Sequence, residues 1–445
     1  MYYGPPVRFR GSDLVLTLAL SAATACGGGL RLGVSSALDR QDLPGALEAY
    51  GRLRASDGDD VELLTRLSSF LLEEQARADD EARREEALTQ LSLAGTAGRP
   101  VLERLAEGGS VHALAILAQI GSGSARDALR DRADDPDPIV RAAALLGLSI
   151  ESDRARLLAL AAEPSARVRS AACGRLAELA PESEARLVLE ERARIDPDPS
   201  VRAAAVRALG EYGAAAIPLL RERLSDPIAS VRMGAVAALF HADRDGARAA
   251  LASLFEMPPS AQGIEAARLL ATPIGRDSAP TDADAAASRA FLVGALEASD
   301  GTLRGQAAVA LVTLPRSPEL ETSLSAALTR ETDAGVRLQI ARAMLGSSAT
   351  ESAAHEALRA LSTADTSMTA LQASIELGAH GDHDAVDRIE QAMHGADIPL
   401  RRTAARALAR DAMQPARAGA ALEDPDASVR IAAAGGILAA SAAAQ

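Results

Sequence analysis

Apolar residues follow a helical period in many short segments of the chain, and one kind of segment returns repeatedly. It begins with an acidic residue, often followed by proline, and runs through Val-Arg into an alanine-rich stretch. In residues 135–148 (DPDPIVRAAALLGL), Asp137 is placed to cap a helix whose first turn holds Pro138. A second short amphipathic segment, such as residues 214–224 (AAAIPLLRERL), lies between successive copies. The pattern therefore predicts repeated helix pairs.

The Val-Arg segments return at a regular interval, with a mean of about 32 residues between copies. Two degenerate copies, near residues 260–271 and 364–378, fill the two longer intervals. A single helix pair has too little apolar surface to be stable alone, but stacked pairs bury one continuous core. The arginine of this segment, called the marker arginine below, is predicted at Arg141, Arg169, Arg202, Arg232, Arg304, Arg337, Arg402 and Arg430.

An acidic residue stands six positions before the marker arginine in six copies of the segment. The arginine lies near the start of its helix, where the helix dipole disfavours a positive charge, so a nearby carboxylate would stabilise it. Repetition at one spacing predicts a ladder of acid–arginine contacts that fixes the register of the repeats. The alternative is a row of arginines that binds an anionic partner. The residues of the predicted ladder are Asp135 and Arg141, Glu163 and Arg169, Asp196 and Arg202, Asp226 and Arg232, Glu331 and Arg337, and Asp424 and Arg430.

The D-x5-V-R-x2-A pattern of these segments resembles HEAT-repeat proteins of the short, phycobilisome-lyase-like type, over roughly residues 96–445. The resemblance implies an all-α fold, a right-handed α-solenoid of about ten antiparallel helix pairs that form a HEAT-like superhelix. It implies little about function, because the same repeat serves many unrelated roles.

Composition divides the chain further. Residues 271–287 hold Pro273, Gly275 and Pro280 and predict a longer loop, which is either a hinge between two sub-arrays or a tolerated surface insertion. Residues 41–95 keep a helical pattern but lack the Val-Arg segment. The expected order is a signal peptide over residues 1–25, a flexible tether over 26–40, an N-terminal helical cap over 41–95, HEAT-like repeats over 96–270, the loop over 271–287 and HEAT-like repeats over 288–445.

The N-terminal residues have the layout of a secretory signal. Arg8 and Arg10 precede an apolar run over residues 14–25, which is too short to span a membrane. The run ends at Cys26, is followed by three glycines, and resembles a bacterial lipoprotein signal, in which the cysteine becomes the lipid-carrying first residue. The resemblance implies a protein held at the bacterial cell envelope by lipid on Cys26. The alternative is a cytoplasmic protein that keeps these residues as a first helix.

Charge and composition narrow the kinds of partner. The formal net charge is −14, so a nucleic-acid groove, which carries excess positive charge, is not expected. Aromatic residues make up 2% of the chain and tryptophan is absent, which disfavours an aromatic-lined ligand pocket. We therefore expect no cofactor, a protein or peptide partner on the concave surface, and membrane contact through the lipid anchor alone.

Few residues combine into a candidate catalytic or metal site. Histidines and aspartates gather in HGDHD (residues 380–384) and near His394, but a turn between helices is expected there, where exposed polar residues are ordinary. His355 and Glu356 form one His-Glu pair, whereas the HEAT-like deoxyhypusine hydroxylases carry several such pairs to hold two irons. Cys173 lies in an alanine-rich helix, so we expect it to be buried and inert. The sequence predicts no enzyme.

These patterns together predict a non-catalytic protein–protein interaction scaffold, exported as an envelope lipoprotein. One alternative is an enzyme-accessory or cofactor-handling protein of the lyase-like or hydroxylase-like kind, which would carry bound iron or a chromophore. The other is a cytoplasmic scaffold.

Overall fold

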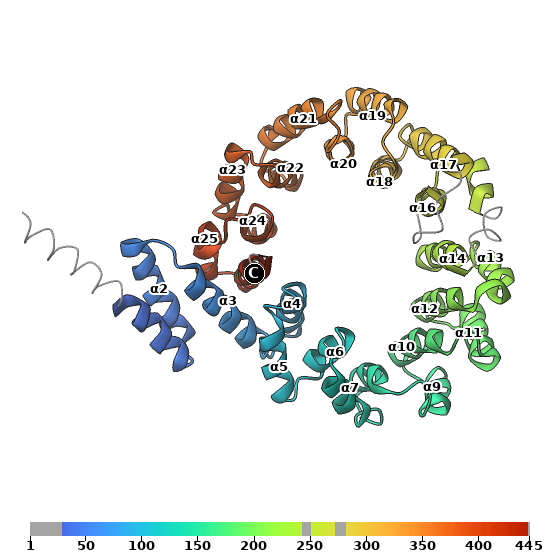
Figure 1. Cartoon of the computed structure of the whole chain (residues 1–445), viewed down its shortest axis with the longest axis horizontal. Coiled ribbons are helices and arrows are strands. Elements are labelled where there is room, and N and C mark those ends of the chain that lie inside the picture. Colours follow the sequence, from blue (N-terminus) through green and yellow to red (C-terminus); the bar gives the residue numbers. More distant parts are fainter. Residues whose placement is uncertain (1–28, 243–250, 272–281, 444–445) are drawn as a thin grey trace, which may run out of the picture. The chain divides into compact units, whose positions relative to one another are not determined.

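The structure is a computed structural model that describes residues 29–242, 251–271 and 282–443. Within these ranges every regular element is a helix and none is a strand. Successive helices pair and stack, so the predicted all-α solenoid is confirmed (Figure 1). No described helix is both long enough and apolar enough to cross a membrane. The predicted signal peptide over residues 1–25 and its lipidation site, Cys26, lie outside the described residues.

The described chain forms two compact units. Unit 1 combines the residues up to 105 with those from 378 onward, and unit 2 contains residues 106–377. The helices of unit 2 are α6 (Val111–Gln119), α7 (Gly123–Arg130), α8 (Pro138–Ala144), α9 (Arg154–Leu160), α10 (Ala166–Leu176), α11 (Ser183–Ile195), α12 (Pro199–Leu209), α13 (Ile217–Arg223), α14 (Ala229–Ala242), α16 (Ala261–Ala271), α17 (Asp282–Ala295), α18 (Gly301–Leu311), α19 (Pro318–Arg330), α20 (Ala334–Met344), α21 (Glu351–Ala364) and α22 (Met368–Ala379), whose last residues belong to unit 1.

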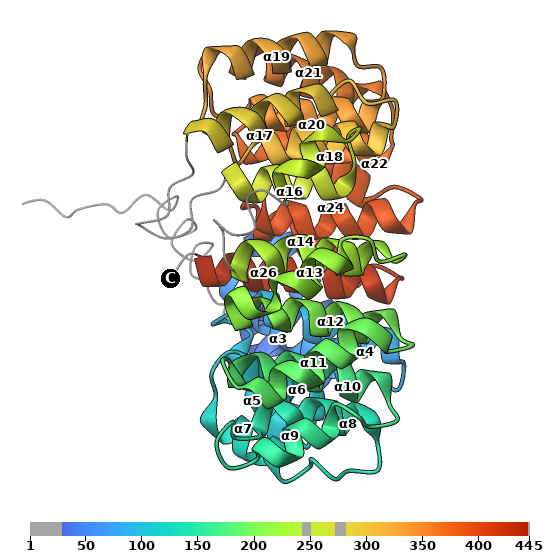
Figure 2. The same cartoon turned by 90° about the vertical axis from the view of Figure 1, so that its right-hand side faces the viewer.

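Unit 2 has two rows of helices. The inner row contains α10, α12, α14, α16, α18 and α20, and the outer row contains α9, α11, α13, α17, α19 and α21 (Figure 1). In the side view the successive pairs are stacked in the order of the sequence (Figure 2). Alanine allows the close packing of the inner row: on α12, Ala203, Ala205 and Ala208 are all buried. Leu189 of the outer helix α11 and Leu209 of the inner helix α12 are both fully buried in one core.

Aspartate and proline set where the inner helices begin. The predicted cap of α8 is confirmed, because Asp137 accepts a hydrogen bond of 2.8 Å from the Ile139 amide and Pro138 opens the helix. On α12, Asp198 and Pro199 play the same two roles. The local sequence therefore fixes where each inner helix begins, and with it the position of the marker arginine on that helix.

In unit 1 the first and last parts of the chain share one core. α26 packs against α24 and also against α3 and α4. Glycine permits this approach, because a Cβ on Gly435 would lie 2.3 Å from Gln90 Oε1, and a Cβ on Gly436 would lie 2.7 Å from the Arg406 carbonyl oxygen. The helices of this unit are α2 (Leu43–Asp57), α3 (Val61–Gln75), α4 (Glu81–Leu93), α5 (Arg99–Glu107), α23 (His383–Met393), α24 (Ile398–Arg410), α25 (Pro415–Ala418) and α26 (Ala427–Ala443).

The predicted flexible tether over residues 26–40 is wrong where the structure describes it. Residues 29–39 form a helix, and Val34, Ala37 and Leu38 are buried on one side of it. Their spacing is that of one helical face, so this segment packs instead of linking.

The loop predicted over residues 271–287 is shorter in the structure than the sequence indicated. α16 ends at Ala271, and residues 282–287 belong to α17, because their alanines favour a helix. Residues 272–281 lie outside the described part of the chain. The boundaries between the two units fall elsewhere, near residues 105 and 377.

Candidate functional site: an arginine–carboxylate ladder and an adjoining groove

Each marker arginine is anchored to the loop before its own helix. On α12, Nη1 of Arg202 donates to the backbone carbonyl oxygens of Asp196 and Pro197, at 3.0 and 3.5 Å. The acid six positions earlier thus contacts its arginine through the backbone and not through the carboxylate. The same carbonyl contact, at 2.7 to 3.0 Å, joins Arg141 to Asp135, Arg169 to Glu163, Arg232 to Asp226, Arg304 to Ala298, Arg337 to Glu331 and Arg430 to Asp424.

The carboxylate that neutralises a marker arginine comes from the next repeat. Nε and Nη2 of Arg169 donate to the two carboxylate oxygens of Asp196, each at 2.9 Å. This corrects the predicted pairing of each acid with the arginine six positions later, because the arginine side chain extends toward the following loop. The observed ladder pairs are Arg141 with Glu163, Arg169 with Asp196, Arg202 with Asp226, Arg304 with Glu331 and Arg401 with Asp424.

Each ladder acid, meaning the acidic residue at the position of Asp196 in its repeat, also shapes its own loop. One carboxylate oxygen of Asp196 accepts a hydrogen bond of 3.0 Å from the amide of Asp198, the cap of α12. The carboxylate therefore holds the turn of one repeat and the arginine of the previous repeat at once. The amide two residues later is bonded in the same way by Asp135, Glu163, Asp226, Glu331 and Asp424.

The predicted marker Arg402 does not belong to the ladder, and its neighbour Arg401 does. Arg401 donates to two carbonyl oxygens of its own loop and lies 2.9 Å from the carboxylate of Asp424. Arg402 is exposed and approaches Glu86 at 3.8 Å. The cap at Asp397, four positions before Arg401, sets this register.

Burial and charge act against each other at the ladder acids. Burial opposes ionisation of Asp196, but hydrogen bonds from Arg169 and from a backbone amide hold the pKa of its carboxyl below the usual value. The same balance lowers the pKa of Asp226, and at Glu331 the guanidinium of Arg304 has the largest effect. These acids are therefore ionised at neutral pH although they are buried.

The ladder stops where a repeat lacks its members. α16 carries Ile264 where other repeats have the marker arginine, and the next loop carries Ala298 where they have the acid. A second junction of this kind follows α22, where Leu371 stands at the position of the marker arginine and Gly395 at the position of the ladder acid. At both junctions the arginine and its acid are missing together, as expected for residues that act as pairs.

Three marker arginines make no ion pair with any residue that the structure describes. Arg232 faces a repeat with Pro258 at the position of the ladder acid. Arg337 faces Asp365, which has the right position but is exposed and not within ion-pair distance. Arg430 belongs to the last helix of the described chain.

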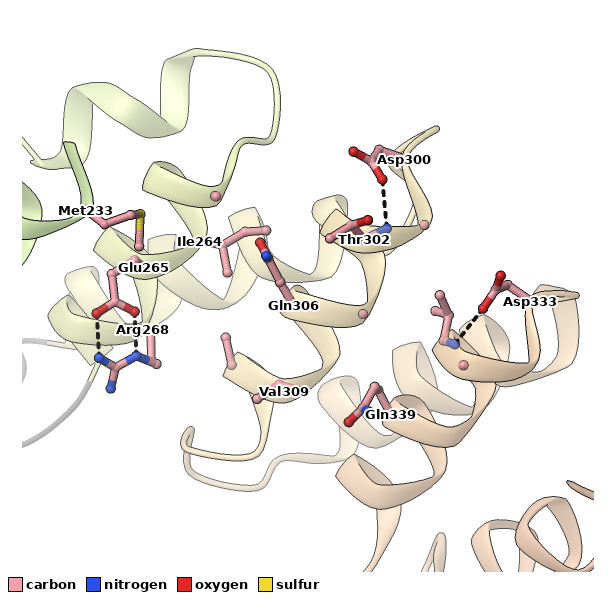
Figure 3. A pocket seen from close by; sticks show the side chains of 16 residues that line it. Met233, Ile264, Glu265, Arg268, Asp300, Thr302, Gln306, Val309, Asp333 and Gln339 are labelled. Atoms are coloured by element: carbon pink, nitrogen blue, oxygen red, sulfur yellow. Dashed lines mark hydrogen bonds and ion pairs between the residues drawn. The ribbon is translucent and has the colours of Figure 1, made fainter. Parts of the chain in front are cut away.

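An open groove of about 880 Å³ lies across the inner row of unit 2, over α14, α16, α18 and α20 (Figure 3). Met233, Ile264 and Val309 give it an apolar surface, and Val309 is 50% exposed. Gly305 and Gly335 also line the groove and leave space because they carry no side chain. The groove is thus accessible from solvent and crosses several helices.

The charged side chains of the groove already have partners. Asp300 and Asp333 accept hydrogen bonds of 2.8 and 2.9 Å from amides at the starts of α18 and α20, which they cap. Glu265 and Arg268 pair on α16, at 2.6 Å (Figure 3). These four side chains therefore stabilise the helices that carry them, and none of them is placed as a general acid or base.

Two uncharged polar side chains in the groove, unlike the charged ones, have no hydrogen-bond partner among the described residues. Gln306 on α18 and Gln339 on α20 each stand two positions after a marker arginine, so they occupy equivalent places on neighbouring helices. Neither amide side chain has a hydrogen bond to a described residue. Both are available to bind a ligand.

Sequence reasoning missed the groove, although a signal was present. Two positions after the marker arginine, only α18 and α20 among the described helices carry glutamine, and the other helices with such an arginine carry a small residue. The small residues are Ala143, Ala171, Ala204, Gly234, Thr403 and Ala432.

The other residues singled out in the sequence have ordinary surroundings. Asp382 of the HGDHD segment caps α23 with a hydrogen bond of 3.0 Å from the Ala385 amide. Among residues 29–242, 251–271 and 282–443, no group of three His, Cys, Asp or Glu side chains is placed to hold a metal ion. Cys173 is fully buried on α10, and burial raises the pKa of its thiol to about 12.

Comparisons with known proteins agree with the repeat. A family model for HEAT repeats matches residues 154–239 and 187–271. Human deoxyhypusine hydroxylase in complex with glycerol is similar over 71% of this chain and 96% of its own, at 19% identity and a TM-score of 0.26. Yeast importin-beta is similar over 83% of this chain and 51% of its own, at 14% identity and a TM-score of 0.36. No curated protein sequence matches the chain.

The family match confirms the HEAT repeats that the Val-Arg pattern predicts, within residues 154–271. The narrower resemblance to the phycobilisome-lyase type and the lipoprotein signal stay predictions. At such TM-scores neither solved structure bears on function.

Proposed function

We propose that this protein is a non-catalytic scaffold that binds an extended segment of a partner protein in the groove of unit 2. The observation that carries the proposal is a pair of side-chain amides, Gln306 and Gln339, at equivalent places on α18 and α20, neither of which bonds a described residue. A side-chain amide offers both a donor and an acceptor, which are the two groups that a peptide backbone needs.

The geometry of packed helices suits a chain that crosses them. Neighbouring helices lie about 8–10 Å apart, and an extended chain advances about 3.3 Å per residue. The two amides would therefore meet backbone groups about three residues apart. Side chains of the same segment would pack on Met233, Ile264 and Val309, which face the groove (Figure 3).

A selected peptide tests this proposal. Twelve-residue random peptides displayed on phage are selected on the full-length protein, and the affinity of a synthetic copy is measured by fluorescence polarisation. The double variant Gln306→Ala/Gln339→Ala is expected to bind at least tenfold more weakly, because both amide contacts are lost. The matched control is Gln119→Ala/Gln414→Ala, which removes two exposed glutamines outside the groove. Equal affinity for the groove variant and the control would overturn the proposal.

We also propose that the protein is exported and held at a bacterial envelope by lipid on Cys26. The support is the sequence layout alone: Arg8 and Arg10, an apolar run, then a cysteine followed by glycines. Intact mass of the protein from its own host, after fractionation, tests it. A lipidated chain that starts at Cys26 in the membrane fraction is expected. A chain in the soluble fraction that keeps residues 1–25 would contradict the export proposal and leave the scaffold proposal unaffected.

A further inference from the structure

The marker arginines that form ladder pairs share one pattern of hydrogen bonds from the guanidinium group. Nη1 donates to carbonyl oxygens of the arginine's own loop. Nη2 donates to the carboxylate of the next repeat, and in every pair except that of Arg141 the Nε atom donates to the same carboxylate. In Arg304, Nε and Nη2 lie 2.7 and 3.1 Å from the two oxygens of Glu331, and Nη1 lies 2.9 Å from the Ala298 carbonyl oxygen. The loop thus orients the carboxylate-binding edge.

Arg232 on α14 has the same anchor. Its Nη1 donates to the carbonyl oxygens of Asp226 and Pro227, at 2.9 and 3.0 Å. The side chain is half-buried, and neither its Nε nor its Nη2 atom bonds a described residue. The carboxylate-binding edge of Arg232 is therefore oriented in advance.

Among its described residues, the next repeat supplies no carboxylate to this edge. The ladder acid stands two residues before the helix cap, and before the cap at Ser260 that position is Pro258, which is exposed. Glu256 lies two residues further back and makes no ion pair with Arg232. The two repeats are joined instead by Gln262, which donates a hydrogen bond of 2.8 Å to the carbonyl oxygen of Leu224.

The other marker arginines without an ion pair differ from Arg232. Arg337 faces a repeat that has Asp365 at the position of the ladder acid, so the acidic residue type is present in that repeat. Arg430 lies on α26, after which no further repeat follows in the described chain. Arg232 alone among the described marker arginines faces a repeat in which another residue type has replaced the acid.

We propose that Arg232 binds a carboxylate of the partner, from an Asp or Glu side chain, in the place of the missing ladder acid. The planar Nε–Nη2 edge matches the two oxygens of a carboxylate. In each of the five observed ladder pairs, the group bound to this side of the arginine is a carboxylate. The inference rests on the proposed function, because the next residue, Met233, lines the groove that would hold the partner segment. It names an acidic residue as one anchor of that segment.

The peptide selected on the full-length protein provides the first test. We expect an Asp or Glu at one fixed position of the selected sequences. Replacement of that residue by its amide, Asn or Gln, should weaken binding at least tenfold, because a charge-assisted bidentate contact becomes a neutral one. This test changes only the peptide, so it is independent of the folding of any variant.

The second test fills the vacant position from within the chain. Pro258→Asp places a carboxylate where the other repeats have their ladder acid, and it should compete with the peptide and weaken binding at least tenfold. Pro258→Asn removes the proline without adding charge. Ala298→Asp adds the same charge at the equivalent position of the next junction, where Ile264 replaces the arginine. Both controls should bind within twofold of the unchanged protein.

The outcomes separate this inference from the proposed function. If Gln306→Ala/Gln339→Ala weakens binding but neither Pro258→Asp nor the amide peptide does, the groove binds the partner and the role of Arg232 is overturned. If Pro258→Asp and the amide peptide weaken binding but the glutamine variant does not, Arg232 is supported and the groove proposal fails. A selected peptide that carries no acidic residue also overturns the inference.

Discussion

Arg169 and Asp196 face each other across a repeat junction, with both carboxylate oxygens 2.9 Å from the guanidinium and side-chain exposures of only 10% and 0%. Each residue has further bonds: Arg169 to two carbonyl oxygens of its own loop, and Asp196 to a backbone amide. Removal of Asp196 would leave the guanidinium of Arg169 buried without its counter-charge. Removal of Arg169 would leave Asp196 only the longer contact of 3.5 Å to Arg192. We therefore expect this junction to depend on the ladder more than any other.

The first prediction concerns the stability of this pair. Asp196→Ala should lower the free energy of unfolding by about 3 kcal/mol, because it strands the buried guanidinium of Arg169. Arg169→Ala should have a smaller effect, because Arg192 stays within 3.5 Å of Asp196, and the double variant should lose less than the sum of the two. Urea unfolding at pH 7, followed by circular dichroism, measures all three values.

An exposed ion pair on the same protein gives the control. Arg99 and Glu103 lie 2.9 Å apart on α5, with side-chain exposures of 52% and 50%. Arg99→Ala should cost less than about 0.5 kcal/mol, because solvent screens such a pair. Fully additive losses for Arg169→Ala and Asp196→Ala would show that the two residues do not act together.

The ladder also predicts how stability depends on pH. The folded-state pKa values of Asp196, Asp226 and Glu331 lie below their usual values, so these acids stabilise the fold above pH about 4. The stabilisation is lost as the pH falls through the folded-state values. Unfolding free energy should therefore change little between pH 7 and 5 and decrease progressively below pH about 4.

Asp196→Asn tests the contribution of one ladder acid to this acid sensitivity. The variant should be less stable than the unchanged protein at pH 7, yet it should lose less stability between pH 5 and 2.5, because one proton-linked group is gone. Urea unfolding at a series of pH values provides the comparison. Identical acid sensitivity in the two proteins would mean that ionisation of Asp196 is not linked to folding.

The sequence predicts the repeat well because each repeat carries its own local signals. Asp137 and Pro138 begin α8 as expected, and the alanine-rich helices that follow the marker arginines all form. Local spacing could not predict the partner of each arginine. The acid six residues before Arg169 is close in sequence, but the side chain of Arg169 extends to Asp196 of the next repeat.

The groove was missed for a similar reason. Gln306 and Gln339 are unremarkable as single residues, and they acquire meaning when the register places them at equivalent positions on α18 and α20. The helix at residues 29–39 shows a different limit. Its apolar residues Val34 and Leu38 have helical spacing, but the glycines before them favoured the prediction of a tether.

The third prediction concerns the buried thiol. Burial, followed by the nearby charge of Asp196, raises the pKa of Cys173 to about 12, so almost no thiolate forms at pH 8. In a Cys26→Ser background, iodoacetamide should leave the folded protein unmodified over hours and alkylate Cys173 rapidly in urea. Mass spectrometry after each incubation gives the result. Rapid alkylation of the folded protein would show that α10 opens or that Cys173 is accessible.

The last prediction concerns the packing of α24 against α26 in unit 1. A Cβ on Gly436 of α26 would lie 2.7 Å from the Arg406 carbonyl oxygen and 3.1 Å from the Ala409 Cβ, both on α24. Alanine favours a helix by about 1 kcal/mol over glycine, but overpacking against a backbone atom costs about 1–3 kcal/mol. Gly436→Ala should therefore lower the free energy of unfolding, by about 1 kcal/mol, as α24 and α26 are forced apart.

Gly174 on α10 provides the matched control, because a Cβ there would meet no atom within 4 Å. Gly174→Ala should raise the unfolding free energy by about 0.5–1 kcal/mol, since it gains helix propensity without a clash. Urea unfolding measures both variants under the same conditions. Stabilisation by both substitutions would mean that α24 and α26 are not in close contact at Gly436.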